Sequence, residues 1–530
     1  MTRVIETDVC IIGAGISAAM VAERLAERTS ASITVVEAGQ STTPLEGRFE
    51  RRQRFLDYGE NPYPDDHVDG LTGFGALYRS MVVGGSAMHW GGAVPRFSPE
   101  DFRLRSLYGV GDDWPLSYDQ LDPLFQEAEE RMGVAGEQGP PEYDPRSASY
   151  PMPPVPLGYN LERLREVAAK ADIPFWTQPW AKNTVPYQGR NVCQRCDTCS
   201  ICPTGAKYTP DFAFDRLISS GRIELLERTV VRRLELESGS DNVERAVAVD
   251  RDSPEQELEI RAGLFVVAAG HTWSPHLLLS SPNSRFPTGL ANRTDMVGRY
   301  MTGHWFVSAF LDLPLKTFPG LFPSNSLLSR KFARPGPLGR YVRHDMRLWE
   351  STVGRGPRLR DDEGQVLLGD EVMSDWRARN LRSTARVRAY YDVLPDRDSR
   401  LTLDGQARSP WGDPLPRLAF RAHPDSVDLR AHTEETIRER FGQLASAGGG
   451  SVTSPRSSDL FEHPGGGCRM GDDPNTSVVD SYGRTHDHEN LFVVGAPTMV
   501  SGGCANGTLT FCALSLRAAA EMERDLPLNA

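Results

Sequence analysis

The first residues with a recognisable chemical pattern are Gly13, Gly15 and Ala18, close to the N-terminus. Gly13 would allow a tight turn, Gly15 would let the backbone approach a pyrophosphate, and Ala18 would permit close packing of a helix on a strand. Glu37 follows 22 residues after Gly15, where an acid binds the hydroxyl pair of a ribose. These four residues predict a bound adenine dinucleotide, and the pattern alone does not choose between FAD and NAD.

A strand–helix–strand unit is needed to position these residues, and the surrounding sequence predicts one. Residues 9–12 form a continuous, largely β-branched run typical of a buried parallel strand, and residues 18–28 are rich in Ala and Leu. A second β-branched run at 33–36 ends directly before Glu37. The pyrophosphate is expected at the N-terminus of the helix, where free N–H groups favour an anion. We therefore expect an α/β protein with a Rossmann-type dinucleotide-binding domain.

Further along the chain, residues 80–97 are rich in glycine, so their backbone could lie against a flat ring system. Three more blocks, at 264–279, 463–471 and 490–510, combine small residues with histidine or asparagine. Together these blocks resemble the glucose–methanol–choline (GMC) oxidoreductase family, closest to its pyranose 2-oxidase-like and bacterial sugar dehydrogenase branches. The resemblance reaches both ends of the chain and is loose from about 301 to 460.

The resemblance implies that the cofactor is FAD and that residues of these blocks lie beside it. The implied flavin-binding residues are Gly84, Gly85, Ser86, His89, Trp90, Gly495 and Thr508. Thr508 would begin a C-terminal helix running to about Met522, whose N-terminal dipole would stabilise an anionic reduced flavin.

The resemblance also assigns the chemistry to His463 and Asn506. Oxidation of a CH–OH group needs a base for the hydroxyl proton while hydride leaves carbon, and a neutral imidazole suits that task. His463 opens the motif that holds the family's base, and Asn506 stands at the position of its partner. Gly507 follows where the family usually has Pro, which leaves this loop freer.

His89 has three interpretations, which the sequence leaves open. In pyranose 2-oxidase-like proteins the matching histidine is covalently bound to the flavin. In several bacterial relatives a histidine precedes the Trp without such a bond and packs on the flavin. The third interpretation is a purely structural role.

Four cysteines lie within ten residues, in a Cys-x2-Cys-x2-Cys-x2-Cys-Pro run: Cys193, Cys196, Cys199 and Cys202. A bacterial ferredoxin run is close, with three residues before its last Cys-Pro. The run also resembles bacterial sugar dehydrogenases, whose iron–sulfur cluster passes flavin electrons to a cytochrome. An iron–sulfur cluster, structural cysteines and a zinc site remain open, and zinc fits less well because zinc knuckles are separated by a longer loop.

The 530 residues carry a net charge of −12, which argues against a nucleic-acid partner. No apolar run is long enough for a membrane helix. Strand character begins at Val9, which leaves no room for an export signal, so we expect a cytoplasmic protein. Five segments are expected: 1–135, 211–300 and 461–530 for FAD binding, an insertion with the cysteine run at 136–210, and a substrate-binding domain with an antiparallel sheet at 301–460. Within these, residues 222–268 predict an accessory sheet and residues 427–447 a helix.

These observations favour FAD-dependent oxidation of a CH–OH group on a small polyol: a sugar, amino sugar or glycoside. One alternative is the catalytic subunit of an iron–sulfur and cytochrome-linked sugar dehydrogenase, which would need an electron-acceptor protein. The other is an oxidase of a non-carbohydrate alcohol. His463 and Asn506 argue against a non-catalytic flavoprotein.

Overall fold

The computed structural model describes residues 3–42, 44–60, 72–73, 80–320, 325–334 and 341–529. One of its two large sheets has seven strands, with β5-β2-β1-β8-β7-β6 in order and β16 also paired with β8. These strands are β1 (Arg3–Ile12), β2 (Ile33–Val36), β5 (Glu224–Leu226), β6 (Thr229–Leu236), β7 (Val243–Asp250), β8 (Glu257–Val267) and β16 (Leu491–Val493).

The strand–helix–strand unit predicted at the N-terminus is present, with a longer first strand than expected. β1 pairs with β8 along its whole length, whereas only Val9–Ile12 also pairs with β2. The part paired on both sides is buried and corresponds to the apolar run at 9–12. The first half of the strand is partly exposed. The polar residues before Val9 therefore belong to the strand because one neighbour is enough to hold them.

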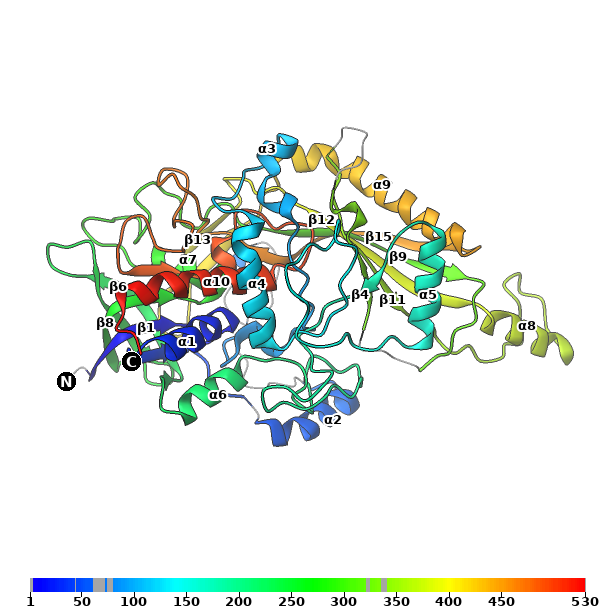
Figure 1. Cartoon of the computed structure of the whole chain (residues 1–530), viewed down its shortest axis with the longest axis horizontal. Helices are drawn as coiled ribbons and strands as arrows, with labels where there is room; N and C mark the ends of the chain where they lie inside the picture. The colour runs from blue at the N-terminus through cyan, green and yellow to red at the C-terminus, as the bar shows by residue number, and fades with distance from the viewer. Residues whose placement is uncertain are drawn as a thin grey trace.

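Helices α1 (Ile16–Arg28) and α10 (Thr508–Met522) pack against each other on this sheet, and α4 (Tyr118–Met132) packs on α10. Figure 1 shows these three helices together, with both termini of the chain at the same end of the molecule. α6 (Asp211–Ser219) contacts α1, and α7 (Gly270–Leu279) follows β8. The predicted C-terminal helix is confirmed with its expected bounds.

The accessory sheet expected at 222–268 is not separate. The expected sheet was antiparallel or mixed, and it is mixed: β6, β7 and β8 pair antiparallel, and β8 also pairs parallel with β1 and β16. β8 is eleven residues long, so its start reaches β7 and its apolar end lies between β1 and β16. The antiparallel strands therefore extend the dinucleotide-binding sheet.

The second large sheet has six strands in the order β15-β9-β12-β11-β10-β4. They are β4 (Trp176–Thr177), β9 (Thr302–Leu313), β10 (Leu327–Ser329), β11 (Met346–Glu350), β12 (Ser383–Asp392) and β15 (Ser451–Gly465). Every pair in it is antiparallel. α5 (Tyr159–Lys170) and α9 (Pro424–Ala447) cover it, and α9 begins three residues before the expected 427 because the His423 side chain accepts a hydrogen bond from the Asp425 N–H.

Smaller elements complete the described chain. β3 (Thr72–Gly73), β13 (Arg400–Arg408) and β14 (Pro414–Ala419) form a three-stranded sheet. The remaining helices are α2 (Arg48–Tyr58), α3 (Leu104–Tyr108) and α8 (Asp370–Asn380), of which α8 projects from the far end of the six-stranded sheet (Figure 1). Among the described residues, no helix has both the length and the apolar character to cross a membrane.

Candidate active site

A cavity of about 360 Å³ lies at the carboxyl ends of β1, β2 and β8. Ligands of open α/β sheets bind at this edge of the strands. The first turns of α1 and α10 line the cavity, so two helix N-termini face the same space. Residues from the turn between β8 and α7 close another side.

Gly13 and Gly15 lie in the turn between β1 and α1, at the edge of the cavity. Gly13 has a φ of +101°, and a Cβ there would lie 2.8 Å from the carbonyl oxygen of Ala268. A Cβ on Gly15 would meet no atom within 4 Å. The turn therefore requires glycine at 13, and the space in front of Gly15 is open for a ligand to approach the backbone.

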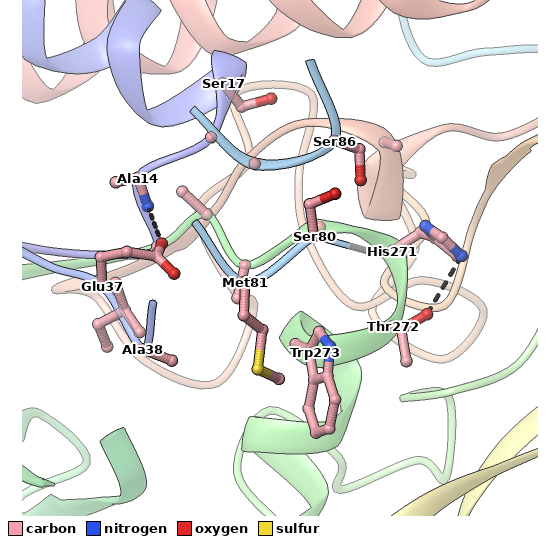
Figure 2. Close-up of a pocket in the computed structure, with 18 of the residues that line it drawn as sticks. Ala14, Ser17, Glu37, Ala38, Ser80, Met81, Ser86, His271, Thr272 and Trp273 are labelled. Atoms are coloured by element: carbon pink, nitrogen blue, oxygen red, sulfur yellow. Dashed lines mark hydrogen bonds between the residues drawn. The ribbon is translucent and has the colours of Figure 1, made fainter. Parts of the chain in front are cut away.

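Glu37 braces this turn from the end of β2. Its two carboxylate oxygens accept hydrogen bonds from the N–H groups of Ala14 and Gly39, each at 2.8 Å. Burial raises the pKa of Glu37 to about 7. Figure 2 shows Glu37 joined to Ala14, with Ser86 and His271 around the same cavity.

The predicted catalytic pair comes together beside the cavity. Nδ2 of Asn506 lies 2.5 Å from Nε2 of His463, although 43 residues separate them in the chain. His463 comes from the end of β15, and Asn506 lies just before α10. Oδ1 of Asn506 is buried and has no hydrogen-bond partner among the described residues.

A bulge in β15 sets the orientation of the His463 side chain. The register of β15 against β9 shifts between Glu462 and Gly465, so two residues of β15 stand opposite one of β9. His463 lies in this bulge with a φ of +52°, a backbone conformation that non-glycine residues seldom adopt. Bulges next to active sites commonly redirect a side chain, and this one turns the imidazole out of the sheet pattern.

A second histidine, His304 of β9, contacts His463 and was not predicted from the sequence. Its Nδ1 lies 3.1 Å from Nδ1 of His463, and its Nε2 lies 2.8 Å from the carbonyl oxygen of Gly502. The two histidines are 159 residues apart, and only the pairing of β9 with β15 brings them together. The one signal in the sequence is a histidine within an otherwise apolar strand.

The surroundings keep His463 neutral. Burial and the positive charges of Arg347 and Arg388, together with His304, lower the pKa of His463 well below its usual 6.5. The ring of Tyr390 packs against both imidazoles, with centroids 5.2 Å from His463 and 5.8 Å from His304. An imidazole in this setting can accept a proton at neutral pH.

The residues of the cavity fit FAD. The open space before Gly15 and the N-terminus of α1 suit a pyrophosphate. Glu37 stands where a ribose would bind, and Thr508 at the start of α10 lies on the side of His463. Bound in this way, the flavin ring would lie between the glycine-rich segment and the catalytic pair.

The other predicted cofactor residues divide into two groups. The cavity is lined by Gly13, Gly15, Glu37, Gly85, Ser86, Trp90, His463 and Thr508. Of the described residues, Ala18, Gly84, His89, Gly495 and Asn506 are not in direct contact with it. Ala18 is buried in the core between α1 and the sheet, as its packing role requires. His89 follows the short helix Gly85–Met88 and is half-buried.

Lys207 fastens the cysteine loop to the glycine-rich segment. Its buried Nζ donates hydrogen bonds to the carbonyl oxygens of Met88 at 2.8 Å, Trp90 at 3.0 Å and Cys199 at 2.7 Å. The indole Nε1 of Trp90 in turn donates to the Tyr208 carbonyl at 2.9 Å. The loop therefore lies directly against residues that flank His89.

The four cysteines themselves are not gathered into a metal site. All are free thiols, and in the described part of the chain no three Cys, His, Asp or Glu side chains are arranged to hold a metal ion. Cys202 is buried and accepts a hydrogen bond from the Lys207 N–H, whereas Cys196 is exposed. This arrangement does not fit an iron–sulfur cluster or a zinc ion.

Known proteins are similar to this chain in sequence and in fold. A family model described as GMC oxidoreductase matches residues 395–515, which include His463 and Asn506. The chain is 31% identical to the fructose dehydrogenase large subunit of Gluconobacter japonicus, over 98% of each chain. It is 30% identical to paromamine 6'-oxidase of Streptomyces fradiae, over 98% of this chain and 92% of that protein. The crystal structure of pyridoxine 4-oxidase from Mesorbium loti has the same fold, with a TM-score of 0.62 at 18% identity over 98% of this chain and 99% of that one.

Proposed function

Because the chain belongs to the GMC oxidoreductase family, we propose that it uses FAD to oxidise a CH–OH group of a sugar, amino sugar or glycoside to a carbonyl. The observation that carries this proposal is the His463–Asn506 pair, 2.5 Å apart beside the dinucleotide cavity.

Each residue of the pair has a distinct task. Bound FAD would supply the two-electron acceptor that takes hydride from the substrate carbon. His463 takes the hydroxyl proton on Nε2, and Asn506 holds the substrate oxygen against that nitrogen. General-base catalysis of this kind contributes roughly 10²- to 10⁴-fold to the rate.

Anaerobic bleaching of the flavin tests the proposal. The holoenzyme is mixed with sugars, aminoglycosides, sterols and simple alcohols, the flavin absorbance is followed, and oxygen is then readmitted. We expect bleaching by at least one carbohydrate and little bleaching by the same substrate in His463→Asn. Bleaching only by a non-carbohydrate would contradict the sugar assignment and favour the alternative alcohol oxidase.

A second candidate function is a dehydrogenase, in which the reduced flavin passes its electrons to an acceptor protein instead of oxygen. The contact of the cysteine loop with the flavin-side segment through Lys207 favours electron delivery to an acceptor protein. No three Cys, His, Asp or Glu side chains in the described part of the chain are placed to hold a metal ion, so no step is derived through a cluster. Iron and sulfide analysis of anaerobically purified protein, together with reoxidation by oxygen, decides between the two: iron and slow reoxidation would support the dehydrogenase.

A covalent bond between FAD and His89 is a further element of the proposal. Ala87 and Trp90 on either side of His89 line or flank the cavity, which brings its backbone near the flavin. Acid precipitation is a direct test: yellow colour in the pellet supports a covalent bond, and colour in the supernatant supports noncovalent packing or a structural role.

A further inference from the structure

His304 connects the catalytic base to a backbone carbonyl on its far side. The imidazole is fully buried, with Nε2 at 2.8 Å from the Gly502 oxygen and Nδ1 at 3.1 Å from Nδ1 of His463. A row of three hydrogen bonds therefore runs from Gly502 through His304 and His463 to Asn506.

The carbonyl oxygen of Gly502 determines which atom donates and which accepts in each of these hydrogen bonds. A carbonyl oxygen only accepts, so the proton in the first bond is on Nε2 of His304. In a neutral imidazole the other nitrogen is then an acceptor, and Nδ1 of His304 accepts a hydrogen bond from Nδ1–H of His463. His463, neutral in turn, has its lone pair on Nε2. The amide nitrogen of Asn506 only donates, which agrees with this assignment.

Charged side chains of neighbouring elements surround the two rings. The titratable or charged side chains that face the two rings from β11, β12 and the loop before β11 are Asp345, Arg347, Arg388, Tyr390 and Asp392. Both carboxylates already have a guanidinium partner: Asp345 pairs with Arg347 and Asp392 with Arg343, each at 2.8 Å.

We propose that His304 is a positioning residue that fixes the tautomer of His463, so that the nitrogen facing Asn506 is always the basic one. Free histidine in water favours the opposite tautomer, with the proton on Nε2, which could not accept a substrate proton. When His463 takes the hydroxyl proton on Nε2, its Nδ1–H remains bound to His304.

This inference rests on the proposed role of His463 as the base, and two variants separate it from a structural role. In His304→Asn the side-chain oxygen can still accept from His463 near the position of Nδ1. In His304→Leu no acceptor remains. His344 serves as a matched control, because it is equally buried beside β11 but does not contact His463.

The first measurement is the tautomer itself, in ¹⁵N-histidine-labelled holoenzyme without substrate. The His463 signals are assigned by their absence in His463→Asn. We expect Nδ1–H in the wild type, in His304→Asn and in His344→Asn, and a growing share of Nε2–H in His304→Leu. An Nε2–H tautomer in the wild type would overturn the inference, and this result does not depend on any substrate.

The second measurement is the limiting rate of anaerobic flavin reduction with a substrate found by the panel. We expect ~10²-fold slower reduction in His304→Leu, within the contribution of a general base, and a loss of less than about 10-fold in His304→Asn. Substrate affinity should change little in either variant. Equal losses in His304→Leu and His344→Asn, or none in His304→Leu, would overturn the role of His304, whereas an unimpaired His463→Asn would overturn the proposed function instead.

Discussion

His463 is held in a backbone conformation that histidine adopts at a cost. Its φ of +52° places it in the left-handed region, which is unfavourable by roughly 1–2 kcal/mol for most residues and is tolerated by Asn and Gly. Such outliers persist where the surroundings over-determine them, and here the bulge in β15 and the bond to His304 do so.

We therefore predict that His463→Asn separates stability from activity. The substitution should change the thermal unfolding temperature little, because the relief of backbone strain offsets the loss of the hydrogen bond to His304. Flavin reduction should be ~10²- to 10⁴-fold slower, because the base is lost. FAD content and thermal unfolding, measured on the same preparations as the reduction rate, check both halves. A large fall in stability would contradict the strain argument.

The pH dependence of flavin reduction follows from the lowered pKa of His463. The base works only when unprotonated, so the rate should fall as pH decreases through its pKa, and that pKa lies well below 6.5. We expect an almost flat profile from pH 6.5 upward to neutrality. In Asn506→Asp the carboxylate favours the imidazolium, so the falling limb should move to higher pH and the rate should decrease. An acid limb at or above 6.5 in the wild type would contradict this prediction.

At the scale of elements, Lys207 links two loops that have no regular hydrogen-bonded ladder between them. Its side-chain nitrogen donates to carbonyls from both the glycine-rich segment and the cysteine loop, and burial lowers the pKa of Lys207 to about 7. Loss of a partner from a buried carbonyl costs about 1–3 kcal/mol.

Lys207→Met should therefore lower the thermal unfolding temperature and loosen the cysteine loop. A thiol reagent should modify the buried Cys202 faster in this variant, while the exposed Cys196 reacts at the same rate in both proteins. Lys170→Met, at the exposed end of α5, is the control and should behave as the wild type. Unchanged reactivity of Cys202 would show that the loop does not depend on the lysine.

The sequence predicted those elements whose determinants are local. β2 and α10 have the expected bounds because a short β-branched run and a continuous apolar, alanine-rich run mark them in the sequence itself. β1 was predicted too short because its first half is held by β8 alone, a partner more than 200 residues away. His304 was missed for the same reason, since its role exists only through the pairing of β9 with β15.

At the scale of the whole molecule, one large sheet forms the cofactor cavity and the other holds the catalytic histidine. The seven-stranded sheet and the helix N-termini of α1 and α10 form the dinucleotide cavity, while β9 and β15 of the six-stranded sheet bring His304 and His463 to its edge. The segment between β11 and β12 takes part in neither. It carries α8 away from the sheet, and no residue of α8 is buried (Figure 1).

The two ends of this projecting segment are hydrogen-bonded to each other. Removing the segment therefore tests whether the cofactor sheet and the catalytic strands function without it. The N–H of Arg355 donates to Asn380 at 3.2 Å, and Asn380 in turn donates to the Arg355 carbonyl at 2.9 Å. Glu350 and Ala385 are register partners in the adjoining strands, so the two ends already meet in a hairpin.

We predict that replacing residues 356–379 by a short Gly-Ser linker leaves FAD content, unfolding temperature and the rate of flavin reduction unchanged. The removed part includes apolar side chains that are largely exposed, among them Leu359 and Leu368 at 73% and 71% exposure. Their loss removes apolar surface from water rather than from the core, so no stability should be lost. A slower reduction rate at unchanged FAD content would instead mean that the segment reaches the substrate side of the six-stranded sheet, and the separation between cofactor sheet, catalytic strands and outer segment would no longer hold.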